Sequence, residues 1–596
     1  MAHVDVVDTS APLEGYVAPA RRARRVIFRR RMLVLGLNVV TVAALMAGMG
    51  YALSFGGVSW VEALMFVAYT ITLPWLTIGF WNAVIGTVLL ARGIAPNDPA
   101  LSLPDAGDAP IRSRTALVMA LRNEDPDASF ARLRAMADDV ARAGLAPFVD
   151  FHVLSDTDCA DIAAREERLF AQWGHPRAHY RRRTDNSGYK AGNLEEFCAR
   201  CGDTYDFFLP LDADSMMSAK AIGRLIRIME ARPRIGILQS LVVGTPATAF
   251  FTRVFQFGMR HGMRSYTTGS TWWMGDCGPY WGHNALIRMK PFRDHCKLPV
   301  LSGKGPLSGH VMSHDQVEAV LMRRAGYHVR VLVEEGESWE ENPPTLPDFI
   351  RRELRWCQGN MQYFWLIGMR GLKPVSRLQL GLAIGMYLGA PAWMAFIVLS
   401  MMQLFVPSGS LPAGVGVALF CTIMFFALAP KLLGLIGVLA RGDMARAYGG
   451  RGRVLAGGLL EAVISMLAAP VVGFAIAAFA VGLLFGKKLD WRAQPRADRA
   501  VAWGEALRTF WPQTLFGAAI AALLTVMMPV VLPWAAPLIA GFMLSVPLAV
   551  ATASPLWGRA LCAVGVCDIP EDRARPALLG SVAASEAPAL TAAQAA

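Results

Sequence analysis

Long apolar runs near both ends of the chain constrain its fold more than any other feature. The run at 32–53 is long enough to cross a hydrocarbon core of about 30 Å, because a helix rises about 1.5 Å per residue. A second run lies at 61–90, and further runs begin only after residue 375. With 54% hydrophobic residues in the whole sequence, we expect a membrane protein. Two transmembrane helices at 32–90 and a transmembrane region at 376–557 would then enclose a domain at 93–375.

Basic residues beside these runs predict the orientation of the chain. Seven arginines lie between residues 21 and 31, directly before the first apolar run. Arginine and lysine are enriched in the cytoplasmic segments that flank membrane helices, so the formal net charge of +12 does not require nucleic acid as a partner. We expect cytoplasmic tails at 1–31 and 558–596 and a cytoplasmic domain at 93–375.

The apolar run at 455–485 has no simple assignment within the C-terminal membrane region. Basic clusters at 441–453 and 487–499 place both of its ends on the cytoplasmic side. Its 31 residues are few for two full spans, so we expect a re-entrant or interfacial hairpin that turns near 468–470. The other runs beyond residue 375 account for about four spans.

Between the membrane runs the sequence alternates between strand-like and helix-like segments. The apolar, β-branched and aromatic runs predict strands at 115–121, 147–154, 205–211, 235–243 and 328–333. Apolar residues at helical spacing predict helices at 132–143, 162–173, 193–200 and 219–231. This alternation is typical of an α/β fold with a mainly parallel sheet covered on both faces. No Gly-x-Gly-x-x-Gly follows the first strand, which argues against a dinucleotide-binding domain.

Two carboxylates follow the third predicted strand. Asp212 and Asp214 come directly after the apolar run at 205–211. Ligands of open α/β sheets bind beyond the carboxyl ends of the strands, and carboxylate oxygens there can hold a divalent cation against phosphates. An Asp-x-Asp pair also occurs in surface turns, but its place after a buried strand favours a metal-assisted nucleotide-sugar site.

Other polar residues recur at related positions. Asn123 and Glu124 end the first predicted strand, Asp156 ends the second, and Lys190 opens a predicted helix whose N-terminus suits a phosphate or nucleotide. Each alone has a structural explanation. Acidic residues after three strands of one sheet indicate a common site.

A second set of candidates lies closer to the C-terminal membrane region. Asp315 begins a helical pattern and is either a catalytic carboxylate or a helix cap. Arg355 and Trp356 lie shortly before the membrane and are either part of the site or an interfacial anchor.

The order Asp156, Asp212-Ala213-Asp214, Asp315 and Arg355-Trp356 between membrane segments resembles the family 2 glycosyltransferases, specifically the processive inner-membrane β-glycan synthases. The runs at 281–288, 313–319 and 355–360 are similar to the subfamily that makes osmoregulated periplasmic glucans. The resemblance implies an α/β GT-A-type glycosyltransferase domain inserted between α-helical transmembrane segments.

The resemblance also implies roles for the candidate residues. It places Asn123, Glu124, Asp156 and Lys190 in the uridine pocket. It places Asp212 and Asp214 at the diphosphate with Mg²⁺ or Mn²⁺. Asp315 matches the general base, and Arg355 and Trp356 match the acceptor-side motif. Related synthases have Gln where this chain has Arg352, which puts the contact of that residue with the acceptor sugar in question.

The activity implied is processive, inverting transfer of glucose from UDP-glucose to a growing β-glucan, with a β-1,2-linked backbone, and translocation across the bacterial inner membrane. The implied partners are UDP-glucose, the growing glucan chain, inner-membrane lipids, acyl carrier protein and a periplasmic glucan-modifying protein, with no nucleic acid. Two alternatives are a non-processive glycosyltransferase with a lipid acceptor and a transporter with a regulatory domain. A transporter is expected to carry charged or polar residues within its membrane spans. Lys431 and Glu461 are the only charged residues in the later apolar runs, which argues against a transporter.

The cationic segment at 486–496 is a further candidate. Related synthases have a loop here that closes over the nucleotide, so we expect Trp491 and Arg492 to cover the bound donor. A cytoplasmic loop that binds anionic lipid explains the same residues equally well.

Overall fold

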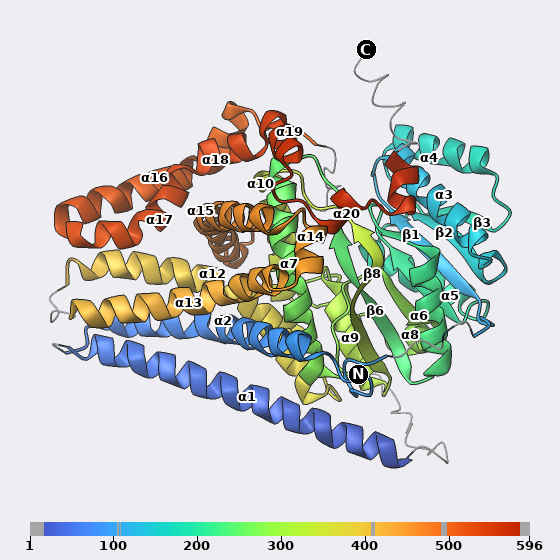
Figure 1. The fold of residues 1–596 in the computed structure, drawn as a ribbon, viewed down its shortest axis with the longest axis horizontal. Coiled ribbons are helices and arrows are strands. Elements are labelled where there is room, and N and C mark those ends of the chain that lie inside the picture. Colours follow the sequence, from blue (N-terminus) through green and yellow to red (C-terminus); the bar gives the residue numbers. More distant parts are fainter. Residues whose placement is uncertain are drawn as a thin grey trace.

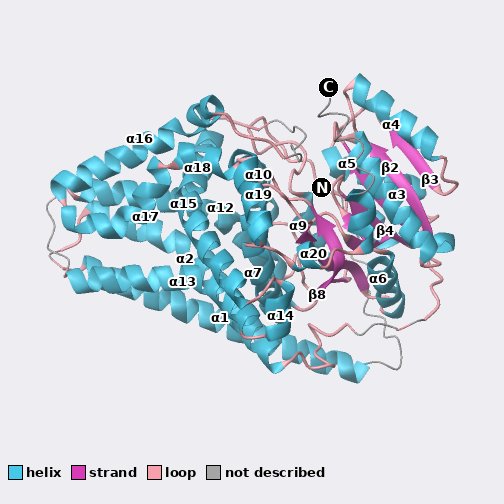
Figure 2. Cartoon of the chain, turned by 45° about the horizontal axis from the view of Figure 1, so that its top comes forward, coloured by secondary structure: helices cyan, strands magenta, loops and turns pink. Residues whose placement is uncertain are grey.

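The computed structural model describes residues 17–55, 57–103, 107, 109–406, 412–489 and 498–583. They form a bundle of long helices and an α/β domain, which lie side by side (Figure 1). Figure 2 shows that the strands are confined to the α/β domain. The chain begins in the bundle with α1 (Val17–Leu53) and α2 (Trp60–Arg92), builds the domain, and returns to the bundle with α12 (Pro374–Gln403). The predicted insertion of an α/β domain between apolar helices is confirmed.

An eight-stranded sheet forms the centre of the domain, in the order β3-β2-β1-β4-β7-β6-β8-β5. Its first half is parallel and consists of β1 (Thr115–Leu121), β2 (Val149–Ser155), β3 (Ala178–Arg182) and β4 (Phe207–Leu211). Its second half is mixed and consists of β5 (Met216–Met217), β6 (Ile235–Gly244), β7 (Ala285–Arg288) and β8 (His328–Glu340). Because β1, β2 and β4 are parallel, their carboxyl ends lie at one edge of the sheet.

All five predicted strands are present, and three short ones were not predicted. β1 has the predicted bounds, whereas β8 continues to Glu340, seven residues beyond the prediction. The extra residues of β8 include Glu334, Glu335 and Glu337, so the apolar signal stops before the strand does. β5 and β7 were not predicted because they are very short. β3 was not predicted because its sequence, Ala-His-Tyr-Arg-Arg, is charged rather than apolar.

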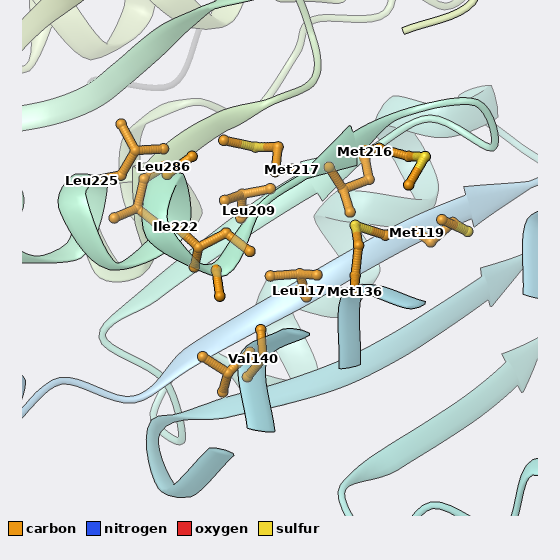
Figure 3. Close-up of a cluster of buried hydrophobic side chains, with 14 of the residues drawn as sticks. Leu117, Met119, Met136, Val140, Leu209, Met216, Met217, Ile222, Leu225 and Leu286 are labelled. Carbon is orange, nitrogen blue, oxygen red and sulfur yellow. The ribbon is translucent and has the colours of Figure 1, made fainter. Parts of the chain in front are cut away.

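Helices cover both faces of the sheet. Those within or beside the domain are α3 (Pro126–Arg142), α4 (Ala160–Trp173), α5 (Tyr189–Cys201), α6 (Ala219–Ala231), α7 (Phe250–Met274), α8 (Met289–His295), α9 (His314–Arg324), α10 (Leu346–Met361) and α11 (Tyr363–Leu366). On one face, Met136 and Val140 of α3 and Ile222 and Leu225 of α6 pack on strand residues such as Leu209 (Figure 3). The buried strands hold the loops at their ends in place.

The long helix α7 joins the domain to the bundle. It packs directly on α2, where a Cβ atom on Gly86 would lie 1.7 Å from the carbonyl oxygen of Ser265. A Cβ atom on Gly269 would lie 1.9 Å from the carbonyl oxygen of Asn82. The side chain of Asn82 also accepts a hydrogen bond of 2.9 Å from the indole of Trp273. Such backbone contact is possible only with glycine at both positions, so the two parts are rigidly connected there.

Six described helices are long and apolar enough to cross a membrane. They are α1, α2, α12, α13 (Ala413–Leu439), α15 (Arg451–Leu484) and α16 (Trp503–Met527). The apolar stretch that contains α17 (Leu532–Met543) and α18 (Ser545–Thr552) bends by 61° and provides a seventh candidate. The short helix α14 (Gly442–Ala447) connects α13 to α15.

The segment expected to form a hairpin is instead the single continuous helix α15. Pro470 lies inside this helix, and Gly541 of α17 leaves room for its ring, since a Cβ atom there would be 2.4 Å from Pro470 Cγ. Both ends of α15 contact the α/β domain. Gly457 meets Phe257 of α7 near one end, and Phe479 and Leu483 pack in the cluster that contains Cys357 of α10 at the other. The helix therefore lies across the domain-facing end of the bundle.

The C-terminal segment folds back onto the domain. After α19 (Pro555–Val564) and the short α20 (Pro570–Arg573), Leu578, Leu579 and Val582 are buried in the hydrophobic cluster of the sheet. Figure 1 shows this red segment running from the bundle across to the strands.

Candidate active site

Asp156 follows β2 at the sheet edge and is buried in an ion pair. Arg183 donates hydrogen bonds of 2.5 and 2.9 Å to its carboxylate, and Asn193 of α5 donates one of 2.7 Å. Arg183 also donates to the carbonyl oxygen of Tyr189, one residue before Lys190. Asp156 and Arg183 therefore hold the start of α5, and with it Lys190, beside the ends of the strands.

Asn123 lies at the end of β1 with a positive φ of 53°. Its side chain donates a hydrogen bond of 2.6 Å to Asp158 and accepts hydrogen bonds from the backbone N–H groups of Asp158 and Cys159. It thus holds the loop after β2 in place. Glu124 is half-buried next to it.

Asp212 and Asp214 lie directly after β4, as the sequence predicts. The ammonium group of Lys190 donates hydrogen bonds to Asp212 and, at 2.8 Å, to the carbonyl oxygen of Gly282. Asp214 is buried and accepts a hydrogen bond of 3.3 Å from the backbone N–H of Glu341. The structure therefore brings together Lys190 and the two aspartates.

The carboxylate oxygens of the two aspartates are suitable ligands for a hard divalent cation. Among the described residues, no group of three or more His, Cys, Asp or Glu side chains is arranged to hold a metal ion. Mg²⁺ is usually held by one or two carboxylates together with waters and substrate phosphates, rather than by a complete protein cage. Asp212 and Asp214 supply that number of carboxylates, and the partly exposed Asp212 can be reached by a ligand.

Asp315 lies in the first turn of α9, next to Gly282. A Cβ atom on Gly282 would be 3.5 Å from Asp315 Cβ and 3.8 Å from His314 Cε1, and the φ of Gly282 is +84°. The carbonyl oxygen of the same glycine accepts the hydrogen bond from Lys190, which also bonds to Asp212. This turn therefore connects Lys190 and Asp212 to Asp315. The run at 281–288, noted above only for its resemblance, thus has a direct structural role.

The side chain of Asp315 is partly buried. Burial raises the pKa of Asp315, and the neighbouring His314 partly opposes this effect. His314 is hydrogen-bonded through Nδ1 to the buried Glu318 at 2.9 Å. Burial alone would lower the pKa of His314, but the carboxylate of Glu318 outweighs it and the pKa is raised. Asp315 is therefore a carboxyl group with a pKa closer to neutrality than that of an ordinary aspartate, next to an imidazole that favours the cation.

The helix α10 carries the acceptor-side candidates. Trp356 is 45% exposed, and the guanidinium carbon of Arg352 lies 4.6 Å from the centre of its ring. Arg352 also lies 5.2 Å from the ring of Phe349, so it stacks between two aromatic side chains of its own helix. Arg355 is half-buried on the same helix. The structure brings these residues together as one basic and aromatic surface.

Two partly buried glutamates belong to the same region and were not predicted. Burial raises the pKa of Glu340, and the charges of Asp214 and Asp212 add to this effect. His283 Nε2 lies 3.3 Å from the carboxylate of Glu340. Burial also raises the pKa of Glu353, which accepts a hydrogen bond of 3.2 Å from Tyr387 of α12. Glu340 lies in the extension of β8 beyond the predicted strand, where no apolar pattern marks it in the sequence.

The remaining candidates, Trp491 and Arg492, lie outside the described residues. The described part of their segment ends at Leu489, whose backbone N–H donates a hydrogen bond of 2.9 Å to Gln358 of α10. Leu489 is thus bonded to the helix that carries Trp356.

A mixed α/β sheet with helices on both faces and the Asp212–Asp214 pair at the end of β4 is the fold of a GT-A-type glycosyltransferase. Residues 207–433 match the family model described as glycosyl transferase family group 2. The glucans biosynthesis glucosyltransferases H of Xanthomonas oryzae and Xanthomonas campestris are 37% and 36% identical to this chain, in each case over 94% of it and 89% of the relative. The protein of the same name from Pseudomonas putida is 38% identical over 87% of this chain and 62% of its own length.

The chain therefore belongs to the glucans biosynthesis glucosyltransferase H family. It is a family 2 glycosyltransferase of glucan synthesis and a membrane protein. Among solved structures, a mannosyltransferase from Pyrobaculum calidifontis in complex with GDP-mannose and Mn²⁺ is similar, with a TM-score of 0.41, 14% identity, and coverage of 63% of this chain and 98% of that one.

Proposed function

We propose that this protein is a processive, inverting glucosyltransferase that polymerises a β-glucan from UDP-glucose and passes the product across the bacterial inner membrane. The observation that supports this most is the position of α10. It carries Arg355 and Trp356 beside the site, and it is bonded to the membrane helix α12 through Glu353 and Tyr387. A growing chain held on α10 would therefore already lie at the entrance to the bundle.

In this proposal the donor lies at the ends of β1, β2 and β4. Asn123, Glu124, Asp156 and Lys190 form the uridine pocket, and Asp212 and Asp214 lie at the diphosphate, where they would hold Mg²⁺ or Mn²⁺. The metal would supply positive charge to the departing diphosphate. Lys190 adds a second positive charge at the same place, which stabilises the leaving group.

Asp315 is the proposed general base. It accepts the proton of the acceptor hydroxyl while that oxygen attacks the anomeric carbon and the bond from that carbon to UDP breaks, with inversion of configuration. Burial of the Asp315 carboxyl strengthens its basicity, since the charged form is desolvated. The exposed face of Trp356 stacks on the acceptor sugar, and Arg352 sets the orientation of that ring.

The domain boundaries in this proposal are those expected from the sequence. Residues 93–375 and the tails at 1–31 and 558–596 lie in the cytoplasm, and the transmembrane segments lie at 32–90 and 376–557. The contact of the C-terminal segment with the α/β domain supports placing both on one side. Inner-membrane lipids surround the bundle, and acyl carrier protein and a periplasmic glucan-modifying protein remain proposed partners.

The decisive experiment is linkage and size analysis of the product that the purified protein makes from labelled UDP-glucose. A long β-1,2-linked polymer is the expected product, and an Asp315→Asn preparation is the matched control. Transfer of single glucose units to a lipid would instead identify the non-processive alternative. Absence of incorporation from UDP-glucose, with incorporation from another sugar nucleotide, would show that the donor is wrong.

A further inference from the structure

A second polar cavity lies away from the candidate active site, where three parts of the chain meet. It has a volume of about 390 Å³. Its walls come from the loop between β6 and α7 with the start of α7, from the start of α15, and from the end of α19 with the segment that follows. The residues that carry the argument are Thr248, Arg253, Arg453, Asp568, Asp572 and Arg575. None of them takes part in the proposed glucosyl transfer.

The charged groups of this cavity do not balance. Arg253, Arg453, Arg573 and Arg575 line it with four positive charges, and Asp568 and Asp572 with two negative ones, which leaves a net charge of +2. The two carboxylates are already engaged. Asp568 pairs with Arg253 at 2.5 Å and with Arg573 at 2.6 Å, and Asp572 pairs with Arg253 at 3.1 Å.

The remaining two arginines carry the excess charge. Arg453 donates hydrogen bonds to the carbonyl oxygens of Val564 and Gly449 and makes no ion pair with a described residue. Arg575 is exposed and forms neither an ion pair nor a hydrogen bond within the described part of the chain. Arg453 also lies in the first turn of the 34-residue α15, whose N-terminus adds partial positive charge.

We propose that this cavity binds a phosphate group, carried either by an anionic lipid or by a soluble phosphate ester. Guanidinium groups match phosphate oxygens in geometry and charge, and a cavity of this size accommodates a whole head group rather than a single ion. The neighbouring helix α19 explains how a lipid reaches it. Cys562 of this helix lines the cavity, whereas Leu556, Trp557 and Val564 on the same helix are exposed apolar side chains that suit a membrane surface.

Contacts from the cavity lead back to α10. Thr248 in the cavity wall donates a hydrogen bond to Asp498, and the next residue, Arg499, pairs with the buried Asp348 of α10 at 3.0 Å. A phosphate bound to Arg453 and Arg575 would connect α15 to the C-terminal segment at this point. The ligand therefore strengthens the attachment of that segment to the domain, and its binding is measurable as stabilisation.

The test uses the full-length protein in nanodiscs and compares the wild type with three variants. Two of them change the cavity, Arg575→Gln and the double variant Arg453→Gln/Arg575→Gln. The third, Arg508→Gln, is the control, because it removes an exposed arginine of α16 that does not line the cavity. In discs that contain phosphatidylglycerol, native mass spectrometry counts the lipids that stay bound. In discs of phosphatidylcholine alone, the melting temperature is measured as inorganic phosphate is added.

We expect binding to weaken by about tenfold for each arginine removed, since each provides a charge-assisted hydrogen bond, and to be unchanged in Arg508→Gln. Loss of retained phosphatidylglycerol in the double variant identifies a lipid site, and loss of stabilisation by phosphate identifies a site for a soluble ester. If the double variant fails to fold, the measurements on Arg575→Gln alone decide whether the cavity binds phosphate. This variant should fold, because the side chain of Arg575 makes no ion pair or hydrogen bond with a described residue. Equal lipid retention and equal stabilisation in the wild type and the cavity variants would overturn the proposal.

Discussion

The donor and acceptor sides of the candidate site differ in how their acidic groups are neutralised. On the donor side, Asp156 is paired with Arg183 and Asp212 with Lys190. On the acceptor side, Asp315 and Glu353 are carboxyl groups whose pKa values are both raised, with burial as the largest cause.

This difference suits the two sides of the candidate site to two different tasks, the binding of charged groups and the transfer of a proton. In the proposed reaction the cations on the donor side would contact the phosphates, so a nucleotide would exchange one set of ionic contacts for another. Carboxyl groups on the acceptor side have raised pKa values, which suits the acceptance of a proton rather than charge binding. Changes on the donor side should therefore affect binding and metal dependence, whereas changes on the acceptor side should affect turnover and its dependence on pH.

The largest expected effect comes from removing the metal site. Asp214→Ala should abolish glucose incorporation, because the diphosphate would leave without the charge that Mg²⁺ or Mn²⁺ supplies. Excess chelator should do the same to the wild type, and added Mg²⁺ or Mn²⁺ should restore it. Incorporation from labelled UDP-glucose is the measurement. Undiminished activity in excess chelator would show that the site works without a metal.

The next effect separates the two sides directly. Asp315→Asn keeps the shape of the side chain but removes its basicity, so transfer should fall by about a hundredfold or more while UDP-glucose still binds. Binding and polymer formation are measured on the same preparation in detergent. Glu318→Gln is the comparison, because Glu318 is a second carboxylate of α9 and is buried. If Asp315→Asn loses binding and transfer together, Asp315 belongs to the donor side; if transfer survives, the base lies elsewhere.

The donor side could be predicted from the sequence more completely than the acceptor side, for a physical reason. On the donor side, Asp156 and Asp212 each follow an apolar strand, and the strand pattern alone places them at one edge of the sheet. The acceptor side is formed by contacts between distant segments. The hydrogen bond between Glu353 and Tyr387 and the turn at Gly282 have no periodic signal.

The membrane region shows the same limit. Length and composition predicted the apolar helices, but the single helix α15 depends on Gly541 making room for Pro470, a contact between segments 71 residues apart in the numbering. Likewise, Lys431 and Glu461 looked like isolated charges in apolar runs. In the structure they form an ion pair, which Ser465 joins through a hydrogen bond.

A smaller effect should appear in the pH profile of His314→Gln. The imidazolium of His314 opposes the burial that raises the pKa of Asp315, so removing it should raise that pKa further. A base works only when deprotonated, and the acid limb of the rate profile should therefore move to higher pH. Activity should fall by less than about tenfold at neutral pH and recover as the pH rises. A uniform loss at every pH would instead indicate that His314 only supports the structure.

The smallest expected effect concerns Arg352, which stands where related synthases have Gln. Its guanidinium lies over the ring of Trp356 and beside that of Phe349, so its contact is with the aromatic surface of α10. A cation over an aromatic ring contributes about 0.5–1 kcal/mol at a partly exposed site, which limits the effect of losing it to a few-fold. Arg352→Gln should thus weaken acceptor binding slightly and shorten the polymer, without changing the affinity for UDP-glucose.

Arg352→Lys is the matched control, because it keeps the charge but loses the planar group that stacks on indole. If orientation of Trp356 is what matters, Lys should behave like Gln, and Trp356→Ala should be worse than either because it removes the stacking surface itself. The measurement is the length distribution of the product at fixed UDP-glucose, with nucleotide affinity determined in parallel. A change in UDP-glucose affinity in Arg352→Gln would place Arg352 on the donor side and break the division between the two halves of the site.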